Sequence, residues 1–261
     1  MSDVDRIADY LFELRQSHRL VPVFPAELMP RDEAMAYRAQ DKLTEKLLTG
    51  SGKILGYKIG ATSEAIRKQT GLKQPIVGPI FEKRVLRTPA TVALKDYGRV
   101  GLELELCVHL AHDLPANKAP YTADSVADAV AGIGTAFELI EDHGAEYGKL
   151  NGLQLIADGS WQSGILISPP VKDWRKQDRF NAPGWVKIDG QETARGKTGD
   201  AMGQCFEGLA WTANLLASQG RSLKAGMMVM TGSIVPTQFP KKGNTVVGHI
   251  QGFGEISLTV T

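Results

Sequence analysis

The amino-acid sequence predicts an α+β protein in which a helical N-terminal cap precedes a mixed, β-rich core. Helical periodicity, with apolar residues three or four positions apart, dominates residues 1–52. Short β-prone runs separated by glycine-containing turns dominate residues 53–261. Strands and long helices do not alternate regularly there, which disfavours a doubly wound parallel sheet. We therefore expect one structural unit built from a helical N-terminal cap (residues 1–52) and a mixed, β-rich core (residues 53–261).

Two helices are expected in the cap. Asp3–Ser17 has Ile7, Leu11 and Leu14 at helical spacing with charged residues between them. A loop containing prolines follows, and a second helix is expected over residues 31–48, ended by the glycines at positions 50 and 52. The candidates for its buried side are Ala34, Tyr37, Leu43 and Leu47.

The core is expected to contain many short strands and few helices. Strands are predicted over residues 54–60, 85–94, 101–110, 135–140, 164–167, 184–188, 227–231, 245–249 and 255–260. Helices are predicted over residues 63–70, 122–132 and 202–219.

Composition excludes several classes of protein. The 261 residues are 43% hydrophobic and 23% charged, which is ordinary for a globular protein. Thirty basic and 29 acidic side chains leave a formal net charge of +1, which argues against a nucleic-acid partner and a polybasic membrane anchor. No run approaches the roughly 18 apolar residues of a membrane helix. Glycine accounts for 28 of the 261 residues, which is more than the average share of about 7%. These glycines are expected mainly at turns and strand ends.

The ends and the cysteines suggest a cytoplasmic protein. Acidic residues at positions 3 and 5 and the absence of a following apolar run do not fit a secretory signal. Cys107 and Cys205 lie far apart and form no CxxC motif, so two reduced thiols are expected rather than a disulfide.

The most informative segment is residues 101–110, whose side chains alternate with a period of two. One face is predicted to carry Leu102, Leu104, Leu106, Val108 and Leu110, and the other Glu103, Glu105, Cys107 and His109. Glu103 and Glu105 would lie about 7 Å apart on one face and repel each other unless a cation neutralised them. Carboxylate oxygens suit Mg²⁺, Mn²⁺ or Ca²⁺. The alternative is a solvent-exposed strand face, although glutamate is a poor strand former.

A third acidic residue stands in an apolar run. Glu138 lies between Phe137 and Leu139, and a carboxylate is costly to bury there unless it is paired or binds a metal. The alternative is an acid at the end of a strand that faces water, because Glu141 and Asp142 follow closely.

Several motifs occur together in an order that resembles the 2-keto-4-pentenoate hydratase and 4-oxalocrotonate decarboxylase family of the fumarylacetoacetate hydrolase superfamily. They are Gly56-Tyr-Lys-Ile-Gly60 followed by Ala61-Thr-Ser-Glu64, the pair Glu103 and Glu105, Glu138, Ala157-Asp-Gly-Ser160, and Thr231-Gly-Ser233. The resemblance covers nearly the whole chain, including the helical N-terminus.

The resemblance implies a rolled, sandwich-like β core of the fumarylacetoacetate hydrolase C-terminal type. It also implies one Mg²⁺ or Mn²⁺ held by Glu103, Glu105 and Glu138. The implied substrates are small 2-oxo or 2-hydroxydienoate acids from aromatic degradation, and the implied assembly is a homo-oligomer, with a complex with a related pathway enzyme also open. A 2-oxo acid chelates a divalent ion through its carboxylate and keto oxygens, and the ion then stabilises the enolate as a Lewis acid.

The resemblance also assigns residues to the substrate. Lys58 matches the family's active-site lysine; as a cation it would hold the substrate carboxylate or enolate, and with a lowered pKa it would exchange protons. Asp158, Ser160, Thr231 and Ser233 match substrate-binding motifs, and hydroxyls with free backbone N–H groups where a strand ends suit a carboxylate. The alternatives are a surface lysine and an ordinary turn.

The sequence departs from the family at two places near the expected reacting end of the substrate. The family's Pro-Asp-aromatic-Gly motif reads Pro75-Ile-Val-Gly78, so Ile76 replaces an acid. The family's Asp-Asn-x-Ser motif has Gly159 at its second position. His143, close to Glu141, is a candidate replacement acid or base, and the alternative is a solvated loop histidine.

The sequence therefore predicts a metal-dependent lyase, with hydration of 2-hydroxypenta-2,4-dienoate (2-keto-4-pentenoate) or a close analogue as the leading reaction. Decarboxylation of a 4-oxalocrotonate-like diacid and hydrolysis of an acylpyruvate are alternatives. A non-catalytic partner subunit that lost the chemistry, suggested by Ile76, is an alternative of another class.

Overall fold

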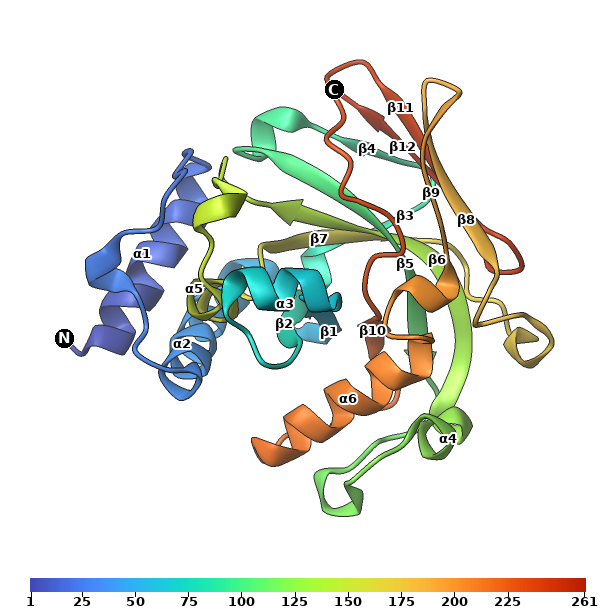
Figure 1. Ribbon diagram of the computed structural model, residues 1–261, viewed down its shortest axis with the longest axis horizontal. Helices are drawn as coiled ribbons and strands as arrows, with labels where there is room; N and C mark the ends of the chain where they lie inside the picture. The colour runs from blue at the N-terminus through green and yellow to red at the C-terminus, as the bar shows by residue number, and fades with distance from the viewer.

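Two β-sheets and six α-helices make up the computed structural model, which describes residues 1–261 (Figure 1). The α+β class predicted from the sequence is confirmed. The larger sheet has seven strands, in the order β2 (Ile76–Phe81), β1 (Ile54–Gly60), β10 (Met228–Met230), β5 (Val100–Leu110), β6 (Val130–Glu141), β7 (Gln162–Ile167) and β3 (Val85–Arg87). The β1–β10 and β3–β7 pairs are parallel and the others antiparallel.

The second sheet has five strands and covers one face of the first. Its order is β4 (Ala90–Val92), β12 (Gly254–Val260), β11 (Thr245–Ile250), β8 (Pro183–Ile188) and β9 (Gln191–Lys197). The sheets share the main core, to which β5 and β6 contribute Leu104 and Phe137. They approach closely at Gly248 of β11, where an added Cβ would lie 2.6 Å from the Phe137 ring. The apolar face of β5 predicted from its alternation is thus buried in this main core.

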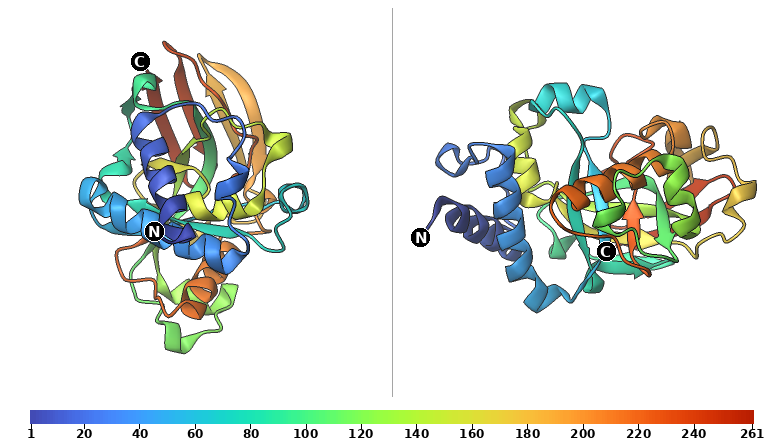
Figure 2. Two further views of the ribbon diagram at one scale, coloured as in Figure 1. Left: turned by 90° about the vertical axis from the view of Figure 1, so that its left-hand side faces the viewer. Right: turned by 90° about the horizontal axis from the view of Figure 1, so that it is seen from below.

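Helices α1 (Asp3–Ser17), α2 (Glu33–Ser51) and α5 (Gly152–Asp158) lie together at one end of the larger sheet (Figures 1 and 2). Their apolar faces form a second core that includes Ile7, Leu43 and Ile156. The buried Gln40 amide of α2 donates to the carbonyl oxygens of Val77 (2.8 Å) and Ile156 (2.6 Å), which fixes α2 to β2 and α5. This core includes residues on both sides of position 52, so the division into cap and core stays a prediction.

The other three helices are α3 (Glu64–Thr70), α4 (Ala123–Val126) and α6 (Cys205–Ser218). Both cysteines are buried and unpaired, as predicted. None of the six α-helices combines the length and the apolar composition that a membrane-spanning helix requires.

Three local predictions were wrong. The strand expected over residues 85–94 is two strands in different sheets, because the chain turns at Pro89, which has no N–H to donate. The helix expected over residues 122–132 ends at Val126, and β6 begins at Val130, where β-branched residues favour a strand. Ala34 is exposed, and the neighbouring Met35 and Ala36 are buried instead.

Candidate active site

Three glutamates meet at the centre of the seven-stranded sheet. Glu103 and Glu105 project from the same face of β5, and Glu138 of β6 lies directly opposite Glu103 in the strand register. One carboxylate oxygen from each lies within 4.8 Å of the other two. Like charges placed directly opposite each other destabilise a sheet. The three side chains therefore form an acidic cluster that needs positive charge.

The glutamate oxygens are held by few protein donors. The Gly232 N–H donates to Glu105 Oε2 (2.8 Å) and the Thr237 hydroxyl donates to Glu103 Oε1 (2.7 Å). Glu105 and Glu138 are fully buried, yet Glu105 Oε1 and Glu138 Oε2 accept no hydrogen bond. Buried polar atoms without partners are costly in free energy. Because Mg²⁺ and Mn²⁺ prefer oxygen ligands, a divalent cation fits these unpartnered oxygens.

Lys58 is the cation nearest the cluster. Its Nζ lies 2.9 Å from Glu138 Oε1, and its side chain is only 2% exposed. Burial lowers the pKa of Lys58, but the carboxylates of Glu138 and Glu103 outweigh it and raise that pKa above its usual value. Burial and the neighbouring carboxylates raise the pKa values of Glu105 and Glu138. One lysine offsets one of three negative charges, so a divalent cation would balance the remaining two.

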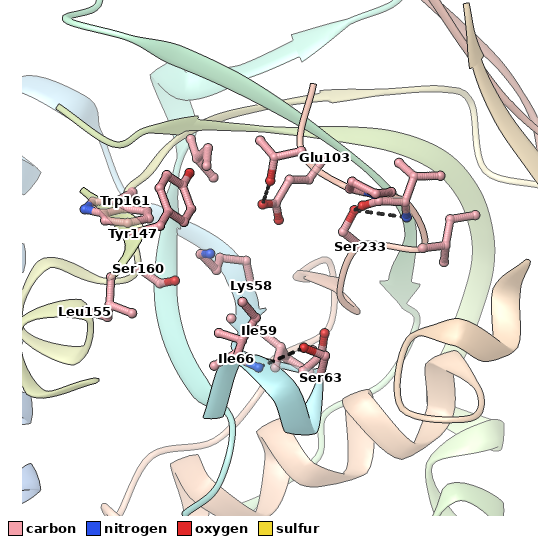
Figure 3. Close-up of a pocket in the computed structure, with 18 of the residues that line it drawn as sticks. Lys58, Ile59, Ser63, Ile66, Glu103, Tyr147, Leu155, Ser160, Trp161 and Ser233 are labelled. Carbon is pink, nitrogen blue, oxygen red and sulfur yellow. Dashed lines mark hydrogen bonds between the residues drawn. The ribbon is translucent and has the colours of Figure 1, made fainter. Parts of the chain in front are cut away.

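A cavity of about 520 Å³ opens beside this cluster (Figure 3). Lys58, Glu103 and Ser233 line it, and Ser160 lines it on the side of Trp161 and Tyr147. The structure thus places four residues predicted from the sequence around one cavity, with Glu105 and Glu138 next to Lys58 and Glu103.

Thr231 does not line the cavity. It is buried, and its hydroxyl donates to the Leu106 carbonyl oxygen (3.0 Å), which fixes the segment after β10 against β5. The predicted binding of substrate by this hydroxyl does not fit its position. The adjacent Gly232 N–H is directed to Glu105 instead of to a substrate carboxylate.

Asp158, predicted to bind substrate, also lies outside the cavity. Its Oδ1 pairs with Arg15 Nε of α1 (2.9 Å), and its Oδ2 accepts the Trp161 N–H (2.9 Å). Ser160 (φ 55°) and Trp161 (φ 61°) both adopt the left-handed conformation that side chains other than glycine rarely adopt. Asp158 therefore holds the strained turn that presents Ser160 and Trp161 to the cavity.

His143, predicted as a catalytic acid or base, lies behind Trp161 on the side of α1 and does not line the cavity. Its backbone carbonyl accepts the Val21 N–H (2.7 Å), and its Nδ1 lies 3.6 Å from Glu141 Oε1. Burial lowers its pKa. The position of His143 outside the cavity does not fit a catalytic acid or base. Its exposure of only 3% does not fit a solvated loop histidine either.

The roles of four residues at the site were missed from the sequence. Gly232 and Thr237 hold the glutamates, and Tyr147 and Trp161 form a wall of the cavity. Residues 231–237 lie more than 120 positions from β5 in the chain, so no local pattern indicates that they contact it. The only feature of the sequence that could have indicated the aromatic wall of the cavity is Trp161, which directly follows the Asp158-Gly-Ser160 segment.

The position of Asp158 predicts a structural effect when it is replaced. Asp158→Ala removes one partner of a buried ion pair, so the free energy of unfolding should fall by about 3–5 kcal/mol. Calorimetric affinity for Mg²⁺ should change little, because the glutamates are untouched. Asp173→Ala, at an exposed aspartate, is the control. A stable Asp158→Ala protein that fails only to bind a 2-oxo acid would restore the predicted substrate contact.

The chain is similar in sequence to a known protein family and to individual relatives. A model of the family described as fumarylacetoacetate (FAA) hydrolase C-terminal matches residues 64–261. The chain is 26% identical over 264 residues to the 2-keto-4-pentenoate hydratase of Burkholderia vietnamiensis strain G4, covering 100% of both chains. It is 25% identical over 264 residues to a 4-oxalocrotonate decarboxylase of a Pseudomonas species, covering 99% of this chain and 98% of the other.

A solved structure shares the fold. The 4-oxalocrotonate decarboxylase of Pseudomonas putida G7, complexed with magnesium and adipate, matches with a TM-score of 0.91 at 21% identity, covering 99% of this chain and 97% of that one. The chain is thus similar in sequence to hydratases and decarboxylases alike.

Proposed function

The chain belongs to the fumarylacetoacetate (FAA) hydrolase C-terminal family, and on this basis we propose that it is a divalent-metal-dependent lyase acting on a small 2-oxo or 2-hydroxydienoate acid. Hydration of 2-hydroxypenta-2,4-dienoate or a close analogue is the leading reaction. Relatives named as hydratases and decarboxylases support an enzyme rather than a non-catalytic subunit.

One observation carries the proposal: three glutamates and one lysine converge beside a single cavity. Glu103, Glu105 and Glu138 would hold Mg²⁺ or Mn²⁺. Once bound, the ion supplies Lewis-acid stabilisation of an enolate oxygen. Gly232 and Thr237 keep two of the carboxylates oriented through their hydrogen bonds.

Lys58 supplies the protein's own positive charge to the reaction. Its ammonium group, fixed by Glu138, stabilises negative charge that develops on the substrate oxygen. In the hydration, a hydroxyl group from water forms a bond to C4. Hydrogen atoms are added at C3 and C5, one from water and one from the enol hydroxyl, and the product is a 4-hydroxy-2-oxo acid.

Decarboxylation of a 4-oxalocrotonate-like diacid is the second candidate, favoured by Ile76. This residue is 1% exposed, and its side chain lies near Gly60 of the lysine strand, where the family motif would place an acid. A decarboxylation needs less proton transfer by the protein than addition of water does. Hydrolysis of an acylpyruvate has less support, because His143 lies outside the cavity.

The two reactions are separated by one assay of the Mg²⁺-loaded protein. We expect 2-hydroxypenta-2,4-dienoate in ¹⁸O-labelled water to give a product carrying ¹⁸O at C4 by mass spectrometry. CO₂ release from 4-oxalocrotonate, without label at C4, would instead establish the second candidate. If the Mg²⁺-loaded protein turns over neither acid nor an acylpyruvate, the proposed lyase is wrong.

A further inference from the structure

The cavity has two chemically different ends. Lys58, Glu103 and Thr237 form the polar end, next to the buried glutamates. The wall that includes Tyr147, Leu155 and Trp161 is mainly apolar, with Ser160 as its polar residue (Figure 3), and Leu150 and Ile66 also line the cavity. Ile66 is 38% exposed although it is a large apolar side chain. A 2-oxo acid held at the polar end would direct its far carbon atoms toward this apolar wall.

The charged residues that line the cavity disfavour a second carboxylate on the substrate. Lys58 is the only lysine or arginine that lines the cavity, and it is paired with Glu138. Asp200 also lines the cavity, on the side of Ile234, and adds negative rather than positive charge to the lining. Arg67 of α3 is close in sequence to Ile66, but its guanidinium donates to the carbonyl oxygens of Ala61 (3.0 Å) and Thr62 (2.7 Å). A distal carboxylate would therefore lose water without gaining a cationic partner.

The aromatic wall is fixed rather than adaptable. The Tyr147 hydroxyl donates to Asp142 Oδ2 (3.1 Å), and Asp142 is in turn paired with Arg99. The rings of Tyr147 and Trp161 meet edge to face with centroids 5.7 Å apart. The Trp161 backbone N–H is already bonded to Asp158. Tyr147 thus presents its ring to the cavity while its hydroxyl is engaged elsewhere, which suits an apolar group.

We propose that the substrate carries an apolar substituent, an alkyl or aryl group, at its distal end, and that Trp161, Tyr147 and Ile66 select it against a second carboxylate. This inference rests on the proposed function, because it assumes that the 2-oxo acid group is bound at the glutamate end. A cavity of about 520 Å³ leaves room for such a substituent beyond a five-carbon chain.

The test measures binding, so it does not depend on turnover. Calorimetry of the Mg²⁺-loaded protein compares three saturated acids: 2-oxopentanoate, 2-oxo-5-phenylpentanoate and 2-oxohexanedioate. We expect the phenyl compound to bind on the order of tenfold or more tightly than 2-oxopentanoate, since each buried methylene group gives roughly a fourfold gain in affinity. The diacid should bind no better than 2-oxopentanoate. Tightest binding of the diacid would overturn the inference.

A variant of Ile66 tests whether the preference for an apolar substituent over a second carboxylate arises inside the cavity. Ile66→Lys adds a cation at an exposed position of the cavity lining and should raise the affinity for 2-oxohexanedioate by about tenfold or more while lowering that for the phenyl compound. Ala65→Lys is the matched control, because it adds the same charge at an exposed neighbour on α3 that does not line the cavity. Equal effects of the two variants would refute selection inside the cavity.

The proposed function and the inference fail in different ways. If none of the three acids needs Mg²⁺ for binding, the metal-dependent site is wrong, and with it the basis of the inference. If all three bind only in the presence of Mg²⁺ but the diacid binds most tightly, the lyase stands, the decarboxylase gains support and the apolar selection is refuted.

Discussion

Replacing Glu105 by Gln is expected to abolish both divalent-metal binding and turnover. The substitution keeps the shape of the side chain and removes one of three negative charges, at a position where Glu105 Oε1 has no hydrogen-bond partner in the protein. We expect the Mg²⁺ affinity measured by calorimetry to fall by more than about 100-fold, since even partners outside the ligand shell are worth 10–100-fold.

Thermal unfolding separates this effect from misfolding. Without metal, Glu105→Gln should be at least as stable as the unaltered protein, because it relieves repulsion among buried carboxylates. Added Mg²⁺ should raise the midpoint of the unaltered protein and leave that of the variant unchanged. Glu255→Gln, at an exposed residue of β12, is the control and should behave like the unaltered protein. Metal-dependent turnover by Glu105→Gln would contradict the assignment of this residue.

Replacing Lys58 by Met is expected to reduce turnover strongly while metal binding is kept. The substitution removes the positive charge next to the reacting oxygen and retains much of the side-chain volume. Loss of one preorganised charge of this kind costs on the order of 100- to 1000-fold in kcat. Mg²⁺ affinity should stay the same or increase, because Glu138 loses its ion-pair partner and its carboxylate becomes fully available to the metal.

Measuring both kcat and Mg²⁺ affinity for the Lys58 variant distinguishes a role at the substrate from a role in the metal site. Lys53→Met, at an exposed lysine just before β1, is the matched control. The Lys58 variant should be less stable than the unaltered protein without metal, and Mg²⁺ should restore much of the difference. Loss of metal binding with unchanged kcat per bound ion would show that Lys58 supports the metal site rather than the substrate.

The parts of the site that lie on strands were predictable because a strand has a fixed period. Alternation in β5 places its leucines in the core and Glu103 and Glu105 on the opposite face, and the structure has this arrangement. Glu138 stood out because an acid inside an apolar strand is costly to bury. Local pattern and the resemblance to a family together thus indicated the charged end of the cavity.

The parts that depend on long-range contacts were not predictable. Asp158 and His143 lie close in sequence to residues of the site but outside the cavity. The Asp158 carboxylate pairs with Arg15 of α1, and His143 lines a small pocket with Leu11 and Leu14 of the same helix. Thr237 contacts Glu103 only through the fold. The chain turn at Pro89 divides one predicted strand between two sheets. The homo-oligomer, the complex with a related pathway enzyme and the cytoplasmic location stay predictions.

The central claim is that Glu103, Glu105 and Glu138 hold one divalent ion that anchors a 2-oxo acid beside Lys58. A crystal structure with Mg²⁺ and oxalate, which mimics the enolate of a 2-oxo acid, tests it most directly. We predict one ion about 2.0–2.1 Å from an oxygen of each glutamate, with oxalate completing its ligands inside the cavity. An ion bound elsewhere, or a cluster in which Lys58 still pairs with Glu138 and no ion is present, would contradict the account.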